Sequence, residues 1–269
     1  MGSNQLPDGV TLQTHAHCQI VIIENLSAEL KEHIREFITA VCHGSAIVET
    51  VPLWNYLNTM KELNARLQAK DRNGRVGMIG ELLTHIFAPY LLPHLVSSAI
   101  YFNKEERNVK KGFDLTFFDE AKGDVWYAEV KSGSPSQGEM ATSKAVGLLK
   151  KAASDLIEKL TSTDRMSLWN SAIFDASVAL KDPALTSVKH ILSNHASLAA
   201  EGKTWDFHAI LTAGVFAHSV DNRISIDSVT KKIDFTSKLE PKFVDEILIT
   251  IQKSTFEAVV DFIANEAGQ

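Results

Sequence analysis

The sequence predicts an α/β fold in which helices flank a mixed central sheet, and three observations support this prediction. Apolar, β-branched segments alternate with helical patterns along much of the chain. Three strand patterns then follow one another with only short connections, at 95–103, 112–119 and 125–132. A long helical pattern at 138–160 separates the third of these strands from the next one, at 205–218. Because short turns join antiparallel neighbours and helix-length connections join parallel ones, both kinds of pairing are expected.

The chain begins with a strand, a helix and a second helix. Residues 17–26 are apolar and β-branched, and Ser27, followed by acidic residues, opens a helical pattern that runs to about Val41. These two elements form an N-terminal β-α addition to the fold. A further helical pattern covers 52–69, with Pro52 at a position that helices tolerate.

A third helix is predicted over 74–92, and its glycines recur every three residues, at Gly74, Gly77 and Gly80. Each glycine inside a helix costs about 1 kcal/mol relative to alanine. Such a cost predicts that this helix packs closely against a neighbour.

The stretch from Leu82 to Asn103 carries no Asp, Glu, Lys or Arg and is long enough to cross a bilayer. Pro89 and Pro93 interrupt it, and its end is polar. It is therefore interpreted as a helix end, a loop and a strand, and no membrane association is expected.

The remaining elements complete the predicted domain. A helical insertion at about 161–204 interrupts the crossover between the long helix and its strand. The segment RISIDSVTKKIDF, residues 223–235, follows the crossover strand. A strand at 243–252 and a helix at 254–267 then form a C-terminal addition. The absence of an internal repeat or linker predicts one domain over 1–269.

The composition limits the classes of function. A formal net charge of −6 argues against a protein that coats nucleic acid through bulk positive charge, so any nucleic-acid contact is local or comes from a partner. Cys18 and Cys42 do not make a disulfide framework, and no signal peptide opens the chain, so a reducing cytoplasm is expected. A zinc site formed by these cysteines with His15, His17 and His43 is disfavoured, because the spacing lacks a zinc knuckle.

The segment WYAEVKSG places Glu129 and Lys131 two positions apart inside an apolar strand. The same spacing occurs elsewhere at a helix start, in a turn, in a loop and across Pro241, so the strand context sets this pair apart. Residues two apart on a strand point to the same face, and the two side chains therefore project together while Val130 points the other way. The structural alternative is a solvated sheet face with a surface ion pair worth about 0–1 kcal/mol.

Asp114 lies on the preceding predicted strand. If the hairpin turns symmetrically about Ala121 and Lys122, residues whose numbers sum to 243 pair across it, and Asp114 faces Glu129 with Cβ atoms about 5 Å apart. A bulge at Gly123 would move this register by one residue. Two carboxylates at that separation repel by about 3 kcal/mol at an effective dielectric constant of about 20, so a cation between them is expected.

Mg²⁺ or Mn²⁺ suits this role, because carboxylate oxygens and water are their preferred ligands and the bound ion can activate a water for attack on a phosphate. Lys131 would orient or deprotonate the attacking water and balance charge in the transition state. Glu81 is the only acidic residue between Asp71 and Glu105, so it lies either at the solvent edge of its helix or at the site.

The order of these residues and elements resembles the PD-(D/E)xK nuclease superfamily: an acid on a helix, Asp114 on a strand, the E-x-K pair on the next strand, and then a crossover helix. The resemblance covers residues 74–218 with the helical insertion, and it implies a restriction-endonuclease-like αβββαβ core. Phe113 stands where the family pattern has proline. More narrowly, GRVGMIGELLTHIFAPYLLP, KKGFDLTFFD and WYAEVKSG resemble the HamA family, the nuclease subunit of Hachiman anti-phage defence systems.

This resemblance implies a Mg²⁺-dependent DNA nuclease that works in a hetero-complex with a helicase subunit, HamB. It implies that Asp114 and Glu129 are metal ligands, that the Val130 carbonyl and Glu81 add to them, and that Lys131 is catalytic. Several basic residues near these strands and on the following helix are candidate contacts to the DNA backbone. They are Lys104, Arg107, Lys110, Lys111, Lys144, Lys150 and Lys151.

A second hypothesis, from another functional class, is a non-catalytic scaffold or DNA-binding module that regulates a helicase and keeps the acids as structural remnants. Divalent-ion binding that depends on Asp114 and Glu129 distinguishes the nuclease from the scaffold.

Overall fold

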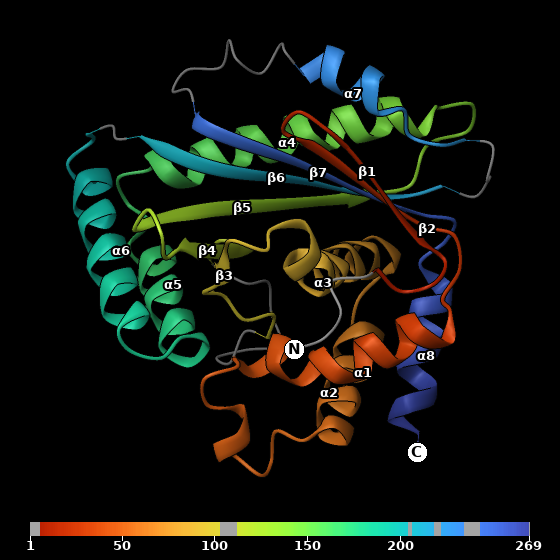
Figure 1. The fold of residues 1–269 in the computed structure, drawn as a ribbon, viewed down its shortest axis with the longest axis horizontal. Coiled ribbons are helices and arrows are strands. Elements are labelled where there is room, and N and C mark those ends of the chain that lie inside the picture. The colour runs from red at the N-terminus through yellow and green to blue at the C-terminus, as the bar shows by residue number, and fades with distance from the viewer. Residues whose placement is uncertain (1–5, 103–111, 204–205, 218–221, 234–242, 269) are drawn as a thin grey trace.

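A computed structural model gives the structure of residues 6–102, 112–203, 206–217, 222–233 and 243–268, and its strands form one seven-stranded sheet with the order β1-β2-β7-β6-β5-β4-β3 (Figure 1). The strands are β1 (Val10–His15), β2 (Cys18–Ile23), β3 (Val96–Ser97), β4 (Leu115–Asp119), β5 (Asp124–Gly133), β6 (Phe207–Phe216) and β7 (Phe243–Lys253). The helices are α1 (Ala28–His43), the 3₁₀ turn η1 (Val48–Thr50), α2 (Tyr56–Gln68), α3 (Arg72–Leu91), α4 (Ala141–Thr161), α5 (Met166–Ala179), α6 (Ala184–Ala200), α7 (Ile226–Ile233) and α8 (Glu257–Ala267).

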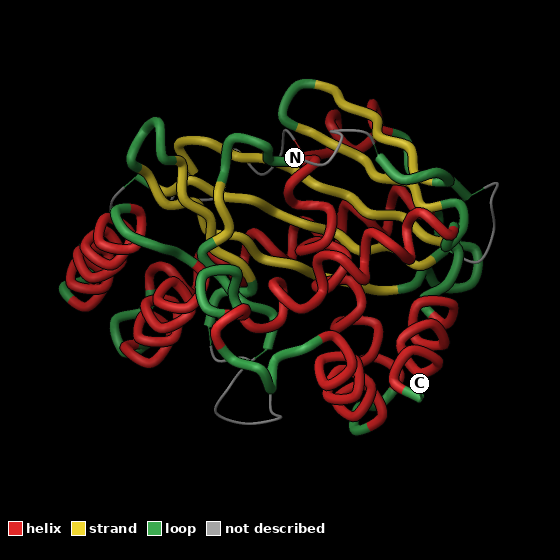
Figure 2. The backbone as a smooth tube through the Cα atoms, turned by 60° about the horizontal axis from the view of Figure 1, so that its bottom comes forward, coloured by secondary structure: helices red, strands yellow, loops and turns green. Residues whose placement is uncertain are grey.

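The pairing of the strands confirms the predicted mixed sheet. Strands β3, β4 and β5 form an antiparallel meander, whereas β5, β6, β7 and β2 are parallel neighbours. Helices α4, α5 and α6 lie in the connection between β5 and β6, so the crossover carries the predicted helical insertion. Figure 2 shows the strands lying side by side with helices packed against them.

The two faces of the sheet carry separate hydrophobic cores. On one side, α3 packs against the sheet, and α1, α2 and α8 share the same core with it. Helices α4, α5, α6 and α7 bury their apolar residues on the other side, and α5 and α6 lie where β5 and β6 begin (Figure 1). Side chains alternate between these cores along each strand, so that Ala128 and Val130 of β5 contact the first core and Tyr127 contacts the second.

The N-terminal strand prediction was incomplete, because the sheet begins with a hairpin. β1 pairs antiparallel with β2, and the turn between them contains Ala16 with a positive φ of 51°. Five of the six residues of β1 are exposed. Val10 and Leu12 are the only apolar residues of this exposed edge strand, an alternation too short to indicate a strand from the sequence.

The predicted strand at 95–103 is much shorter than expected. Only Val96–Ser97 pair with β4, and the chain then leaves the sheet toward the end of α1. There the backbone N–H groups of Tyr101 and Phe102 donate to the carbonyls of Val41 and Cys42, at 2.9 and 3.2 Å. The apolar residues of this segment therefore complete the C-terminus of a helix instead of extending a strand.

The second helix begins later than predicted. Asn55 caps it, because its side-chain oxygen accepts a hydrogen bond from the N–H of Asn58 at 3.0 Å, and α2 starts at Tyr56. Pro52 precedes the helix and does not open it.

The close packing predicted from the glycines of α3 is confirmed at Gly80. A Cβ atom there would lie 1.7 Å from the Oγ of Ser132 on β5, and one at Gly214 on β6 would lie 2.5 Å from the same oxygen. A Cβ at Gly77 would meet nothing within 4 Å, so the explanation is wrong for that residue. Helix α3 thus lies directly on the ends of β5 and β6.

An ion pair with a buried carboxylate ties α8 to α1 and α2. The Nε and Nη2 atoms of Arg35 donate to both carboxylate oxygens of Glu266, at 3.0 and 2.9 Å. The hydroxyl of Tyr56 also donates to Glu266, whose side chain is 8% exposed. Bidentate pairs of this kind fix the orientation of the elements that carry them.

Among the described residues, no helix has both the length and the apolar character that crossing a membrane requires.

Candidate functional site

The hairpin of β4 and β5 has the predicted register. Leu115 pairs with Ala128, so paired residue numbers sum to 243 as expected. Gly123, with a φ of 73°, lies in the four-residue turn and does not shift the pairing.

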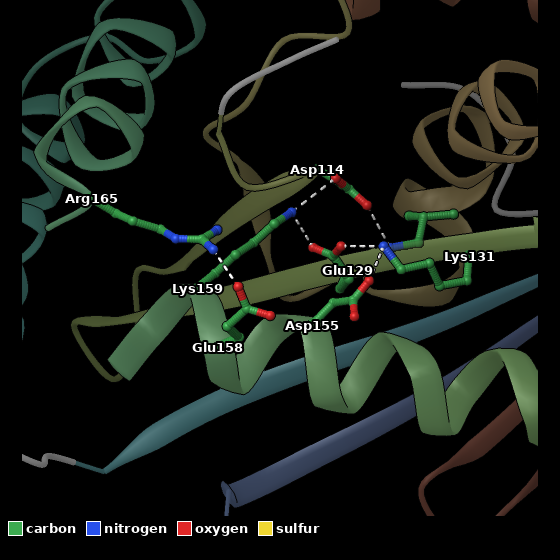
Figure 3. Close-up of polar contacts among 8 residues, drawn as sticks. Asp114, Glu129, Lys131, Asp155, Glu158, Lys159 and Arg165 are labelled. Atoms are coloured by element: carbon green, nitrogen blue, oxygen red, sulfur yellow. Dashed lines mark hydrogen bonds and ion pairs between the residues drawn. The ribbon is translucent and has the colours of Figure 1, made fainter. Parts of the chain in front are cut away.

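Asp114 lies one residue before β4, where the ladder with β5 has ended. Its carboxylate Oδ2 accepts a hydrogen bond from the backbone N–H of Val130 at 2.7 Å (Figure 3). A backbone N–H on a strand needs an acceptor, and here a side chain replaces the missing neighbouring strand. This bond holds the Asp114 carboxylate beside Glu129, as the sequence predicted from the register alone.

Glu129 and Lys131 project together from the face of β5 that α4 covers. Lys131 Nζ lies 2.6 Å from Glu129 Oε1. The side chain of Glu129 is only 1% exposed. The alternative of a solvated sheet face is therefore wrong for this residue, because a surface pair would leave the carboxylate in water.

Helix α4 runs back along β5 and supplies two residues that the sequence analysis missed, Asp155 and Lys159. Lys159 Nζ lies 2.6 Å from Glu129 Oε2 and 3.4 Å from Asp114 Oδ1. Asp155 Oδ2 lies 2.9 Å from Lys131 Nζ (Figure 3). The helix thus presents an anion to the lysine of β5 and a cation to its glutamate.

A sequence signal for these two residues does exist. Asp155 and Lys159 are four apart and so lie on one flank of a helix. Leu156 and Leu160 beside them are fully buried, which brings that flank to the sheet. This spacing identifies Asp155 and Lys159 as site residues only when the face that α4 buries is known.

The charges at the site influence one another strongly. Burial and the Asp114 carboxylate raise the pKa of Glu129, although Lys159 and Lys131 partly offset this. Burial lowers the pKa of Lys131, but Glu129 and Asp155 outweigh it and leave this pKa above its ordinary value. Burial opposes the charge of Lys159 in the same way, and Asp114 and Glu129 outweigh it, so its pKa is also raised. Both lysines are therefore cations at neutral pH.

The donor set at this site fits a hard divalent ion in part. Asp114 and Glu129 direct carboxylate oxygens toward one point, and such oxygens suit Mg²⁺ or Mn²⁺. Lys159 Nζ already lies at that point, so an ion would have to replace it. Within the described residues, no group of three or more Asp, Glu, His or Cys side chains is close enough to hold a metal.

The structure does not bring Glu81 into a three-acid group with Asp114 and Glu129. It lies on α3, which packs against the opposite face of the sheet from α4. Its charge raises the pKa of the buried Tyr101, after the larger effect of burial. Its proposed role as an accessory ligand stays a prediction, as does that of the Val130 carbonyl.

Of the predicted DNA contacts, those on α4 can be placed. A methyl group at Gly133 would meet Lys144 Cε at 2.9 Å, so the stem of Lys144 packs over the end of β5. Lys150 and Lys151 are exposed. The other candidates lie outside the described residues: Lys104, Arg107, Lys110 and Lys111.

The cysteines considered for a zinc site lie on opposite faces of the sheet. Cys18 belongs to the core under α4 and Cys42 to the core under α1, and both are free thiols.

Comparison with known proteins gives one family. A search of curated proteins found no match to this chain. The family model named HamA matches residues 4–267, which is nearly the whole sequence. This confirms the narrower of the two resemblances indicated by the motifs, whereas the PD-(D/E)xK assignment stays a prediction. The chain belongs to the HamA family.

Proposed function

We propose that this chain is a Mg²⁺- or Mn²⁺-dependent deoxyribonuclease, the effector subunit of an anti-phage defence complex that also contains a helicase. Membership of the HamA family supports the role in anti-phage defence. The observation that supports the nuclease is the convergence of Asp114, Glu129 and Lys131 at the open end of the β4–β5 ladder. Two unpaired, buried cysteines agree with action in the reducing cytoplasm.

In the proposed reaction, Asp114 and Glu129 would hold the ion, with the Val130 carbonyl as a further ligand, whereas Glu81 stays a predicted accessory ligand that this structure does not bring to the two acids. A bound divalent ion supplies Lewis-acid polarisation of a phosphate and a lowered pKa for an attacking water. Asp114 is held for this role by its bond to the Val130 N–H, and Glu129 by burial.

Lys131 would act as a cation. Its ammonium group contacts Glu129 at 2.6 Å, so it is placed to orient the attacking water and to stabilise negative charge on the phosphate. Its ion pair with Asp155 fixes the ammonium at the mouth of the site, where its side chain is 21% exposed.

The experiment that tests the proposal uses the chain coexpressed with a HamB-type helicase, the proposed partner. Radiolabelled single- and double-stranded DNA is incubated with the complex and Mg²⁺, and DNA degradation is compared between wild type and Lys131→Ala. We expect degradation by the wild-type complex and none by the variant. Equal degradation by both would contradict the assignment of Lys131.

One observation favours the second hypothesis, the non-catalytic scaffold. The two carboxylates already have cations from the protein itself, because Lys131 and Lys159 both contact Glu129. A complex that still defends cells with both Asp114 and Glu129 replaced by their amides would establish the scaffold and exclude the nuclease.

A further inference from the structure

Lys159 occupies the position between the two carboxylates that the proposed function gives to a divalent ion. Its Nζ lies 2.6 Å from Glu129 Oε2 and 3.4 Å from Asp114 Oδ1. Figure 3 shows its stem crossing from α4 to the strand and its ammonium group directed at both acids. An ammonium group and an ion held by the same oxygens compete, because they repel each other and need the same lone pairs.

The ion pair between Lys159 and Glu129 is part of the packed interior and is not an exposed surface pair. The side chain of Lys159 is 17% exposed and that of Glu129 is 1% exposed. Leu156 and Leu160, on the same helix, are fully buried and fix the rotation of α4 against the sheet. The ammonium group is therefore directed at the acids by the packing of the helix.

The charged residues of α4 are complementary to those of β5. β5 presents Glu129 and Lys131, and α4 presents Lys159 and Asp155 to them. Each charge of the strand pair thus has an opposite charge from the helix. The two lysines neutralise the buried carboxylate of Glu129 when no ion is bound. An unpaired carboxylate buried to this extent would destabilise the fold.

We propose that Lys159 is a placeholder for the divalent ion: it keeps Asp114 and Glu129 in position while the site holds no ion, and it withdraws when an ion binds. This inference rests on the proposed function, because it concerns the same two acids. It implies that the affinity of the site for the ion is set by an exchange of cations and is lower than the two carboxylates alone would give.

The first test measures binding of Mn²⁺ alone to the full chain by isothermal titration calorimetry. Lys159→Met is compared with wild type, with Asp114→Asn, and with Lys122→Met, which removes an exposed lysine from the turn between β4 and β5. We expect Lys159→Met to bind Mn²⁺ at least about tenfold more tightly than wild type. Lys122→Met should match wild type, and Asp114→Asn should lose binding.

The outcomes separate this inference from the proposed function. Mn²⁺ binding that depends on Asp114 but is equal or weaker in Lys159→Met overturns the placeholder and leaves the proposed metal site standing. No Mn²⁺ binding by wild type or by Lys159→Met overturns both.

A second test needs no variant and so does not depend on the folding of Lys159→Met. Wild-type protein is reductively methylated with and without Mn²⁺, and the labelling rate of each lysine is followed by mass spectrometry. We expect Mn²⁺ to raise the rate at Lys159 several-fold, because the ammonium group leaves its ion pairs, and to leave the exposed Lys122 unchanged. An unchanged rate at Lys159 overturns the inference.

Discussion

Glu129 of β5 and Lys159 of α4 form an ion pair between the sheet and the helix that covers it, with Nζ 2.6 Å from Oε2. The carboxylate is almost fully buried, so the pair connects two layers of the protein and also lies within the candidate site. Removing one partner of a buried pair costs about 3–5 kcal/mol. Substitutions here must therefore be assessed for stability and activity together.

Glu129→Gln should abolish most of the DNA degradation. The amide keeps the shape of the side chain but loses the charge that would hold a divalent ion and that pairs with both lysines. We expect the rate to fall by roughly a hundredfold or more, with cooperative thermal unfolding retained. Degradation of labelled DNA and circular dichroism measure the two effects.

The matched control is Glu120→Gln, which removes an exposed carboxylate from the turn of the same hairpin. It should leave the rate at the wild-type level. A wild-type rate in Glu129→Gln itself would remove this residue from the proposed reaction.

Removing divalent ions should stop DNA degradation without unfolding the protein. Lys131 and Lys159 neutralise the acids when no ion is present, so the fold does not depend on the ion. We expect chelator to abolish degradation, Mg²⁺ or Mn²⁺ in excess to restore it, and cooperative thermal unfolding in calorimetry to be retained in chelator. Full activity in chelator would exclude the metal-dependent reaction.

Much of this site was predictable because it depends on local geometry. The turn around Ala121 and Lys122 fixes the register of the hairpin, and this register brings Asp114 beside Glu129. Sequence alone could not find Lys159, since its position depends on how α4 rotates against the sheet. That rotation is a property of the packed core and has no local signature.

In the fold, too, features set by local sequence were predicted, and features set by tertiary packing were not. The buried β5 and β7 were predicted within two residues at each end, because their apolar runs are long. β1 was missed because its residues face water, and the strand expected at 95–103 was too long because its apolar side chains pack elsewhere.

Gly80→Ala should destabilise the protein, and Gly77→Ala on the same helix provides the control. A Cβ at Gly80 would lie 1.7 Å from the Oγ and 2.7 Å from the Cβ of Ser132, so rotation of the serine side chain does not remove the clash and α3 or β5 has to shift. We expect Gly80→Ala to lower the free energy of unfolding by about 1–3 kcal/mol and to reduce DNA degradation.

Gly77→Ala meets nothing within 4 Å and should raise the free energy of unfolding, by up to about 1 kcal/mol. Urea unfolding followed by circular dichroism compares the two variants. Equal stability of the two would show that the contact at Gly80 relaxes without cost.

His195 should make the protein sensitive to acid. Burial, with a smaller effect from His208, lowers the pKa of His195 from 6.5 to about 4. Its Nδ1 shares a hydrogen bond with the hydroxyl of the fully buried Tyr127, at 2.6 Å. Between pH 6.5 and about 4 the unfolded chain binds a proton that the folded protein does not, so stability falls as the pH falls through this window, by about 1–3 kcal/mol.

His195→Asn keeps a hydrogen-bonding group for Tyr127 but cannot be protonated, so the loss of stability between pH 7 and pH 4.5 should be smaller than in wild type. His190→Asn, at an exposed position of the same helix, should leave the wild-type loss unchanged. Urea unfolding at the two pH values measures the difference. The same pH dependence in wild type and His195→Asn would show that another group is responsible.

The place of β7 in the middle of the sheet has a consequence during protein synthesis. In the described sheet β2 lies between β1 and β7, so the β1–β2 hairpin has no further strand to join until residues 243–253 have been translated. β6 likewise keeps an open edge until that moment. A chain that stops before residue 243 therefore lacks the strand that joins β2 to β6, and its sheet stays divided into two parts.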